Sequence, residues 1–262
     1  MPEFWLALLV KMTATAAVVV TATYAAERSG PFWGGLITSL PVAAGPAYVL
    51  LSLQADRDFV AASALASFVT TPASIVFVVV FARLAASRPL AVSLVAAIAA
   101  WFAAALPIAA VAWTPLTGTL LNAVVFWASF RATRRLAAKE IAAAAVRARW
   151  YDLPFRAFLV GSMVAGVVTA SDAIGPLATG MATVFPITFM SFVVILMPRL
   201  GGPFAAVTLA KAIRAMVGFV VALLALHLGT LALGTTEGLV LGLATSLAYS
   251  VVMVLARRLG RA

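Results

Sequence analysis

The sequence predicts an all-α membrane protein, a polytopic helix bundle of about nine spans. The first observation is composition, because 65% of the 262 residues are apolar, only 10% are charged, and the mean hydropathy is +1.13. A soluble domain needs many more charges on its surface. The second is that long apolar runs such as 90–106 are continuous and alanine-rich. They lack the alternation of a barrel strand, so helices are the expected spanning elements.

An internal duplication is the third observation. Residues 29–42 (SGPFWGGLITSLPV) match residues 174–187 (IGPLATGMATVFPI) at a fixed offset of 145, with five identities. Gly and Pro are prominent among those identities, so the match is not explained by composition alone. Internal duplication is common in secondary transporters.

The predicted spans each approach the ~20 residues that cross ~30 Å of hydrocarbon. They cover roughly 4–26, 33–53, 59–82, 89–107, 112–130, 155–173, 177–198, 203–228 and 237–257.

Span boundaries are defined unevenly along the chain. The first span has no basic region before it and aligns with 149–171, so we interpret it as a retained helix and not a signal peptide. Pro107 and Pro115 separate the fourth and fifth spans only weakly, and these two could be one. The basic stretch 131–154 is predicted to lie along a membrane surface.

Basic residues favour an outside N-terminus and a cytoplasmic C-terminus. With this orientation the segments 27–32, 83–88, 131–154, 199–202 and 257–262, together with Arg156 at their boundary, are cytoplasmic and carry fourteen Lys or Arg residues. Only Arg57 lies outside, and three basic residues lie within spans. Loops rich in Lys and Arg remain on the cytoplasmic side, so we expect this orientation in the inner (cytoplasmic) membrane of a cell.

This topology makes the repeats inverted. We expect a 4+1+4 arrangement in which residues 1–110 form the first repeat, 111–154 a linker helix with a basic loop, and 155–262 the second repeat. Five spans separate matching helices, so matching helices cross in opposite directions. If the fourth and fifth spans were one, the repeats would be parallel.

Paired prolines mark the predicted substrate site. Pro41 and Pro186 interrupt the second and seventh spans at matching positions, and each frees carbonyl groups that need new partners. Thr38, Ser39, Thr183 and Thr188 surround them as candidate ligands. Interrupted helices at corresponding positions point to a midplane binding site. The alternative is a pair of ordinary proline kinks.

Two cations lie deep in the eighth span. Lys211 and Arg214 share one helix face about 12–17 Å into the span. A cation at that depth is costly and normally faces a cavity or a partner, which suggests an anion-binding pair. The alternatives are snorkelling, or an ion pair with Glu27 or Asp172.

Two acids precede the matching Gly-Pro steps. Glu27 and Asp172 could couple transport to protons or sodium. Alternatively, they could cap the helix that follows, where a negative charge interacts favourably with the positive N-terminal end of the helix dipole. The capping role is the simpler interpretation.

Several functions are excluded or disfavoured. The chain has no cysteine and one histidine, His227, so we expect no thiolate chemistry, no metal site and no cofactor. The basic residues behind the net charge of +10 mostly flank the spans. They form no basic face with interleaved aromatic residues, so we expect no nucleic-acid partner.

The expectation is therefore a secondary transporter and not an enzyme. Its partners would be a small anionic solute and the lipid bilayer. A homodimer is an alternative to a monomer that the sequence leaves open. The alternatives are a non-transporting membrane subunit and an enzyme that acts on a lipid-linked substrate.

Overall fold

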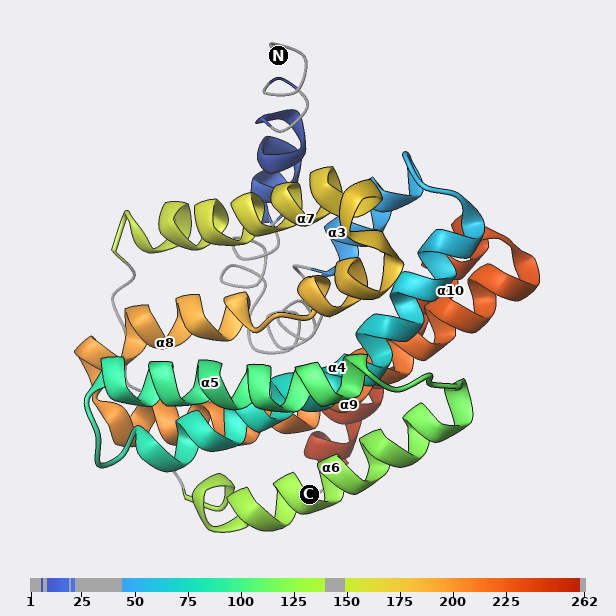
Figure 1. The fold of residues 1–262 in the computed structure, drawn as a ribbon. Helices are drawn as coiled ribbons and strands as arrows, with labels where there is room; N and C mark the ends of the chain where they lie inside the picture. Colours follow the sequence, from blue (N-terminus) through green and yellow to red (C-terminus); the bar gives the residue numbers. More distant parts are fainter. Residues whose placement is uncertain (1–5, 7–8, 19, 22–43, 140–148, 260–262) are drawn as a thin grey trace. The chain divides into compact units, whose positions relative to one another are not determined.

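The computed structural model describes residues 6, 9–18, 20–21, 44–139 and 149–259. Within these residues the chain is helical and contains no strand (Figure 1). A helix over Leu9–Val18 comes first. The labelled helices that follow are α3 (Ala44–Ser52), α4 (Arg57–Leu84), α5 (Leu90–Ala109), α6 (Pro115–Ala137), α7 (Asp152–Thr183), α8 (Ile187–Leu200), α9 (Gly202–Leu233) and α10 (Thr235–Leu259).

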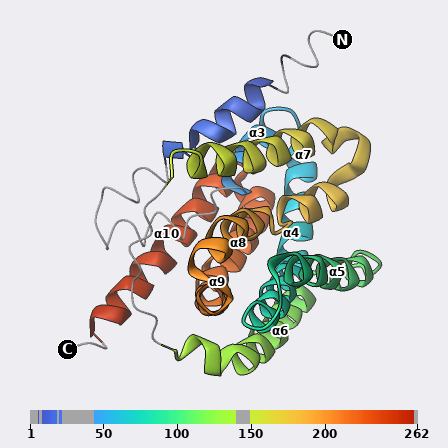
Figure 2. The ribbon, with the colours of Figure 1, turned by 90° about the vertical axis from the view of Figure 1, so that its left-hand side faces the viewer.

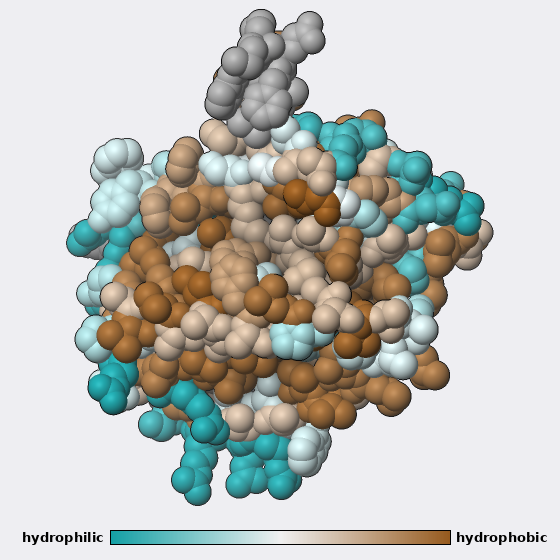
Figure 3. All heavy atoms as spheres, viewed as in Figure 1, coloured by the Kyte–Doolittle hydropathy of each residue, from teal (hydrophilic) through white to brown (hydrophobic). Residues whose placement is uncertain are grey.

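Five described helices are long and apolar enough to cross a membrane: α4, α5, α7, α9 and α10. This agrees with a helical membrane bundle. The helix Leu9–Val18 and α8 are apolar but shorter. The exposed surface of α5 includes Val92, Val95, Phe102 and Leu106, and the face that carries this helix is largely hydrophobic (Figure 3).

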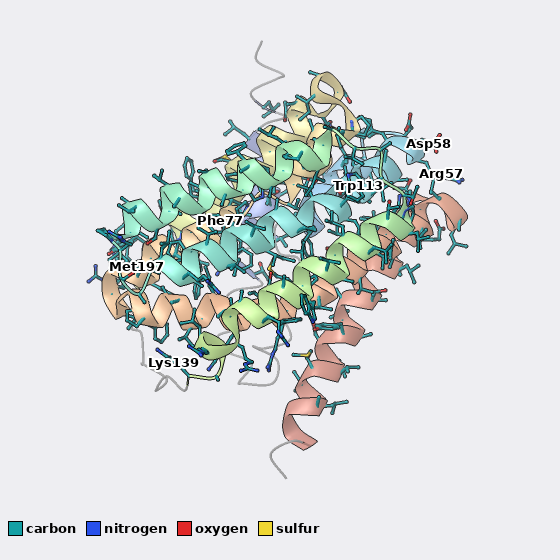
Figure 4. All side chains as sticks on the ribbon, turned by 60° about the horizontal axis from the view of Figure 1, so that its bottom comes forward. Arg57, Asp58, Phe77, Trp113, Lys139 and Met197 are labelled. Atoms are coloured by element: carbon teal, nitrogen blue, oxygen red, sulfur yellow. The ribbon has the colours of Figure 1, made fainter. Side chains whose placement is uncertain are left out.

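Local chemistry fixes the helix starts. The Asp56 carboxylate accepts the Phe59 backbone N–H at 2.7 Å and so caps α4. Thr114 and Thr117 form a reciprocal capping box, with Pro115 at the first position of α6. Arg57 and Asp58 lie at the start of α4, Phe77 lies further along it, and Lys139 lies just beyond the end of α6 (Figure 4).

Helix α7 is divided at Gly175. This glycine has φ +75°, a left-handed value that glycine adopts without steric cost. The chain turns back there, and the segment after Pro176 runs in a new direction (Figures 1 and 2). The boundary predicted between the sixth and seventh spans therefore coincides with a real reversal of the chain.

The chain divides into two compact units that do not follow the order of the sequence. The first unit contains Met1–Phe68, Ala157–Thr183 and Gly218–Ala262, and the second contains Val69–Arg156 and Val184–Val217. Each unit takes segments from both predicted repeats. Buried side chains fill both, among them Leu51 and Phe68 in the first and Phe77 and Phe81 in the second.

Helix boundaries repeat at the offset found in the sequence. Helices α4 and α9 begin at Arg57 and Gly202, and α5 and α10 begin at Leu90 and Thr235, which are 145 positions apart in both cases. Helix α3 moved by the same offset falls within α8.

The packing of these helices crosses between the sequence halves. In the first unit α3 packs against α10, and in the second unit α5 packs against α8. The offset that relates α3 to α8 also relates α5 to α10. The two helix pairs are therefore equivalent, and each joins one element from each half of the sequence.

Helix α9 runs antiparallel to α4 in the first unit. The Arg57 guanidinium donates to the Leu231 carbonyl, and His227 Nδ1 lies 2.8 Å from the Ala61 carbonyl oxygen. Residue numbers rise along one helix as they fall along the other. Because the Ala61 oxygen can only accept, this geometry makes His227 Nδ1 the protonated nitrogen.

Candidate functional site

A helix break lies at 184–186 in the second unit. Helix α7 ends at Thr183, and Pro186 (φ −75°, ψ 38°) is the N-cap of α8. Proline donates no backbone hydrogen bond and cannot continue the preceding turn. An interruption at Pro186 is what the sequence predicts. Pro41, Thr38, Ser39 and Glu27 lie outside the described residues.

Side chains from α4 and α5 stabilise this break. Ser74 Oγ donates to the Val184 carbonyl at 2.6 Å, and Trp101 Nε1 donates to Ser74 Oγ at 3.2 Å, with both contacts buried. The Trp101 and Phe185 rings meet nearly edge to face, with centroids 4.9 Å apart. A protein hydroxyl therefore satisfies the carbonyl that the break releases.

A related contact occurs in the first unit. Ser67 Oγ donates to the Gly180 carbonyl at 2.7 Å. The Tyr48 hydroxyl lies 2.6 Å from Ser67 Oγ and 2.8 Å from the Ser63 carbonyl oxygen. Gly180 permits this approach, because a Cβ there would overlap the Ser63 carbonyl oxygen.

These contacts come from a row of buried hydroxyls along α4, which we call the α4 hydroxyl row: Ser63, Ser67, Thr70 and Ser74. Their spacing places them on one side of the helix. Ser67 and Ser74 are hydrogen-bonded as described above. Ser63 Oγ and Thr70 Oγ1 are buried and find no partner within the structure described. A buried unpaired hydroxyl is costly and suggests a missing ligand, ion or water.

The remaining predicted site residues are distributed between the two units. Thr183, in the first unit, donates to the Thr179 carbonyl at 2.8 Å. Pro186 is buried in the second unit, and the Thr188 carbonyl accepts from Ser191 Oγ at 2.8 Å. Lys211 and Arg214 are both exposed on the part of α9 that belongs to the second unit. Their convergence on one site stays a prediction.

Asp172 is exposed on α7 in the first unit, close enough to Lys11 for their charges to interact. The Lys11 ammonium donates to Gln54 Oε1 at 2.6 Å. Gln54 in turn donates to the Val168 carbonyl at 2.5 Å and to Ser171 Oγ at 3.0 Å. This chain of contacts links the helix Leu9–Val18, the end of α3 and α7.

An ionic cluster joins the start of α7 to the end of α8 in the second unit. The Arg199 guanidinium donates to both carboxylate oxygens of Asp152, at 2.5 Å to Oδ2. Arg149 donates to the Tyr151 hydroxyl at 2.5 Å, and this hydrogen bond lowers the pKa of the Tyr151 phenol. Arg199 also lies over the Tyr151 ring, 5.6 Å from its centroid.

Sequence reasoning missed the α4 hydroxyl row and this ionic cluster. The hydroxyl row has a readable signal, since small hydroxylated residues recur every three or four positions through an apolar span. The Asp152–Arg199 pair is 47 positions apart and has no local signature.

No group of metal-ligating side chains lies within the residues that the structure describes. No family model, curated protein or solved structure matches the chain.

Proposed function

We propose that the chain is a secondary transporter of the inner membrane, which moves a small anionic solute by alternating access between two inverted repeats. In this proposal nine spans cross the bilayer, with the N-terminus outside and the C-terminus in the cytoplasm. Coupling to protons or sodium would involve Glu27 or Asp172.

The observation that carries the proposal is the exchanged helix pairing. The pair α3–α10 becomes the pair α8–α5 when each helix is replaced by the one 145 positions away. A pseudo-two-fold relation between the two sequence repeats would produce this exchange. The antiparallel contacts of α4 with α9, which are themselves equivalent helices, support the inverted form of that relation.

The helix break supports the location of the solute site. Broken helices in transporters expose backbone groups at the depth where the solute binds. At this break, Ser74 holds the Val184 carbonyl, while Thr70, one turn earlier on α4, keeps an unpaired hydroxyl within the described chain. A solute or coupling ion that entered here would find a hydroxyl ready to donate or accept.

Charge supports the choice of an anion. Lys211 and Arg214 belong to the same unit as the break and lie three positions apart on α9. Cations within membrane helices are rare and typically mark a substrate or ion pathway. We propose that the pair binds a carboxylate, sulfonate or phosphate group of the solute.

The test is uptake by proteoliposomes that contain the full chain, measured with a panel of radiolabelled small carboxylates, sulfonates and phosphates. Wild-type protein should exchange at least one of these anions. Changing both Lys211→Gln and Arg214→Gln should weaken its apparent affinity by roughly tenfold or more, since charge-assisted hydrogen bonds are lost. Lys139→Gln, just beyond α6, is the matched control and should transport normally.

Two results would count against the proposal. If the wild-type protein exchanges no anion of the panel, anion transport is wrong. If the double variant transports with wild-type affinity, the pair is not part of the solute site.

A further inference from the structure

The first unit contains a cavity of about 590 Å³. Its walls come from the helix Leu9–Val18, α3, α9 and α10, which all belong to this unit at these positions. The volume lies within the range of small-molecule sites, roughly 300–1,000 Å³. Among the described residues of the predicted solute site, which are Thr183, Pro186, Thr188, Lys211 and Arg214, none lines it.

The described walls are almost entirely apolar and carry no charged side chain. Two of the three side-chain hydroxyls there already have partners: Thr15 Oγ1 donates to the Lys11 carbonyl at 2.9 Å, and Tyr48 is bonded to Ser63 and Ser67. Only Thr236, at the start of α10, remains. A polar ligand would lose its hydration here without gaining hydrogen bonds in return.

The mouth of the cavity carries exposed aliphatic side chains. Val18, Val49, Val240 and Leu243 line it and are each about half exposed, at 47%, 50%, 62% and 50%. Helix α10 is also one of the long apolar helices that could cross a membrane. Such a mouth suits the acyl chains of a bilayer, because neither water nor an empty space satisfies apolar walls as well as hydrocarbon does.

We propose that this cavity binds one hydrocarbon chain. The chain could belong to a membrane phospholipid or to a free fatty acid, since both present the same methylene surface. This inference does not depend on the transport proposal.

The test uses two photoreactive probes, a phosphatidylcholine with a diazirine in one acyl chain and a free long-chain fatty acid with the same group. Full-length protein in lipid nanodiscs is irradiated with each probe, and the adducts are mapped by mass spectrometry. Adducts should concentrate on the cavity peptides of α3 and α10, around Val49 and Leu243. The more efficient probe identifies the source of the chain.

Ala14→Trp places a large side chain in the cavity wall and should reduce these adducts by roughly fivefold or more. Ala17→Trp is the control, because Ala17 is exposed on the same helix but does not line the cavity. Adducts on the exposed face of α5, around Val95 and Phe102, serve as an internal reference and should be unchanged in both variants.

Equal labelling of the cavity peptides and the α5 face would overturn the proposal, because it would indicate only the surrounding lipid. So would undiminished cavity labelling in an Ala14→Trp protein whose α5 reference is normal. If Ala14→Trp loses the α5 reference, Ala222→Phe fills the same cavity from α9 and is judged by the same two criteria.

Discussion

At the residue scale, Gly180 is a tightly constrained position in the first unit. Its missing side chain lets α7 approach α4 closely enough for Ser67 to donate to its carbonyl group. An added Cβ would overlap the backbone of Ser63 and Ser67 and the side chain of Ala66. Small residues of this kind allow membrane helices to pack closely.

Gly180→Ala should therefore lower the free energy of unfolding by about 1–3 kcal/mol, as expected for an overpacked site. Gly166 lies on the same helix with nothing within 4 Å of an added Cβ. Gly166→Ala should be neutral or stabilising by up to about 1 kcal/mol. Thermal unfolding in detergent measures both, and equal effects would show that the close approach at Gly180 is not a constraint.

At the element scale, the break between α7 and α8 depends on its neighbours as much as on Pro186. Ser74 holds the Val184 carbonyl, and Trp101 bonds to Ser74 while packing against Phe185. An unwound backbone segment at membrane depth is stable only where other protein groups satisfy it.

Ser74→Ala should consequently destabilise the fold by about 1–3 kcal/mol, because it leaves the Val184 carbonyl and the Trp101 indole N–H without a partner. Ser87→Ala is the control, since Ser87 is exposed just beyond the end of the same helix. Denaturant unfolding followed by tryptophan fluorescence compares the two. A loss no larger than that of the control would mean that water replaces the serine.

The same elements show what sequence can and cannot predict. Gly and Pro act locally on the backbone, so the break at Pro186 and the reversal at Gly175 were readable. The partners that stabilise these features were not, because Ser74 and Val184 are 110 positions apart and meet only through tertiary packing. Proline alone also misleads, since α4 continues through Pro72.

At the scale of the whole molecule, the predicted repeats and the packed units divide the chain differently. The sequence offset suggests two successive halves, whereas contacts group segments of both halves into each unit. The offset was readable from Gly and Pro identities. The exchange of helix partners could not be predicted from the sequence, because the paired helices are far apart along the chain and meet only through tertiary packing.

Orientation is testable at this scale, because the natural chain has no cysteine. Ala138→Cys, just after α6, should resist an impermeant thiol reagent added to whole cells, as its segment is predicted to be cytoplasmic. Val111→Cys, exposed between α5 and α6, should react readily. Labelling of the first and protection of the second would reverse the predicted topology.

The pairing of α3 with α10 has a consequence for biosynthesis. Helix α3 ends at Ser52 but contacts a helix that begins only at Thr235. During synthesis, α3 therefore lies in the translocation machinery or among lipids until the last helix emerges. A truncation that ends before α10 removes a helix that packs against α3. Loss of the C-terminal helix should therefore weaken packing near the N-terminus.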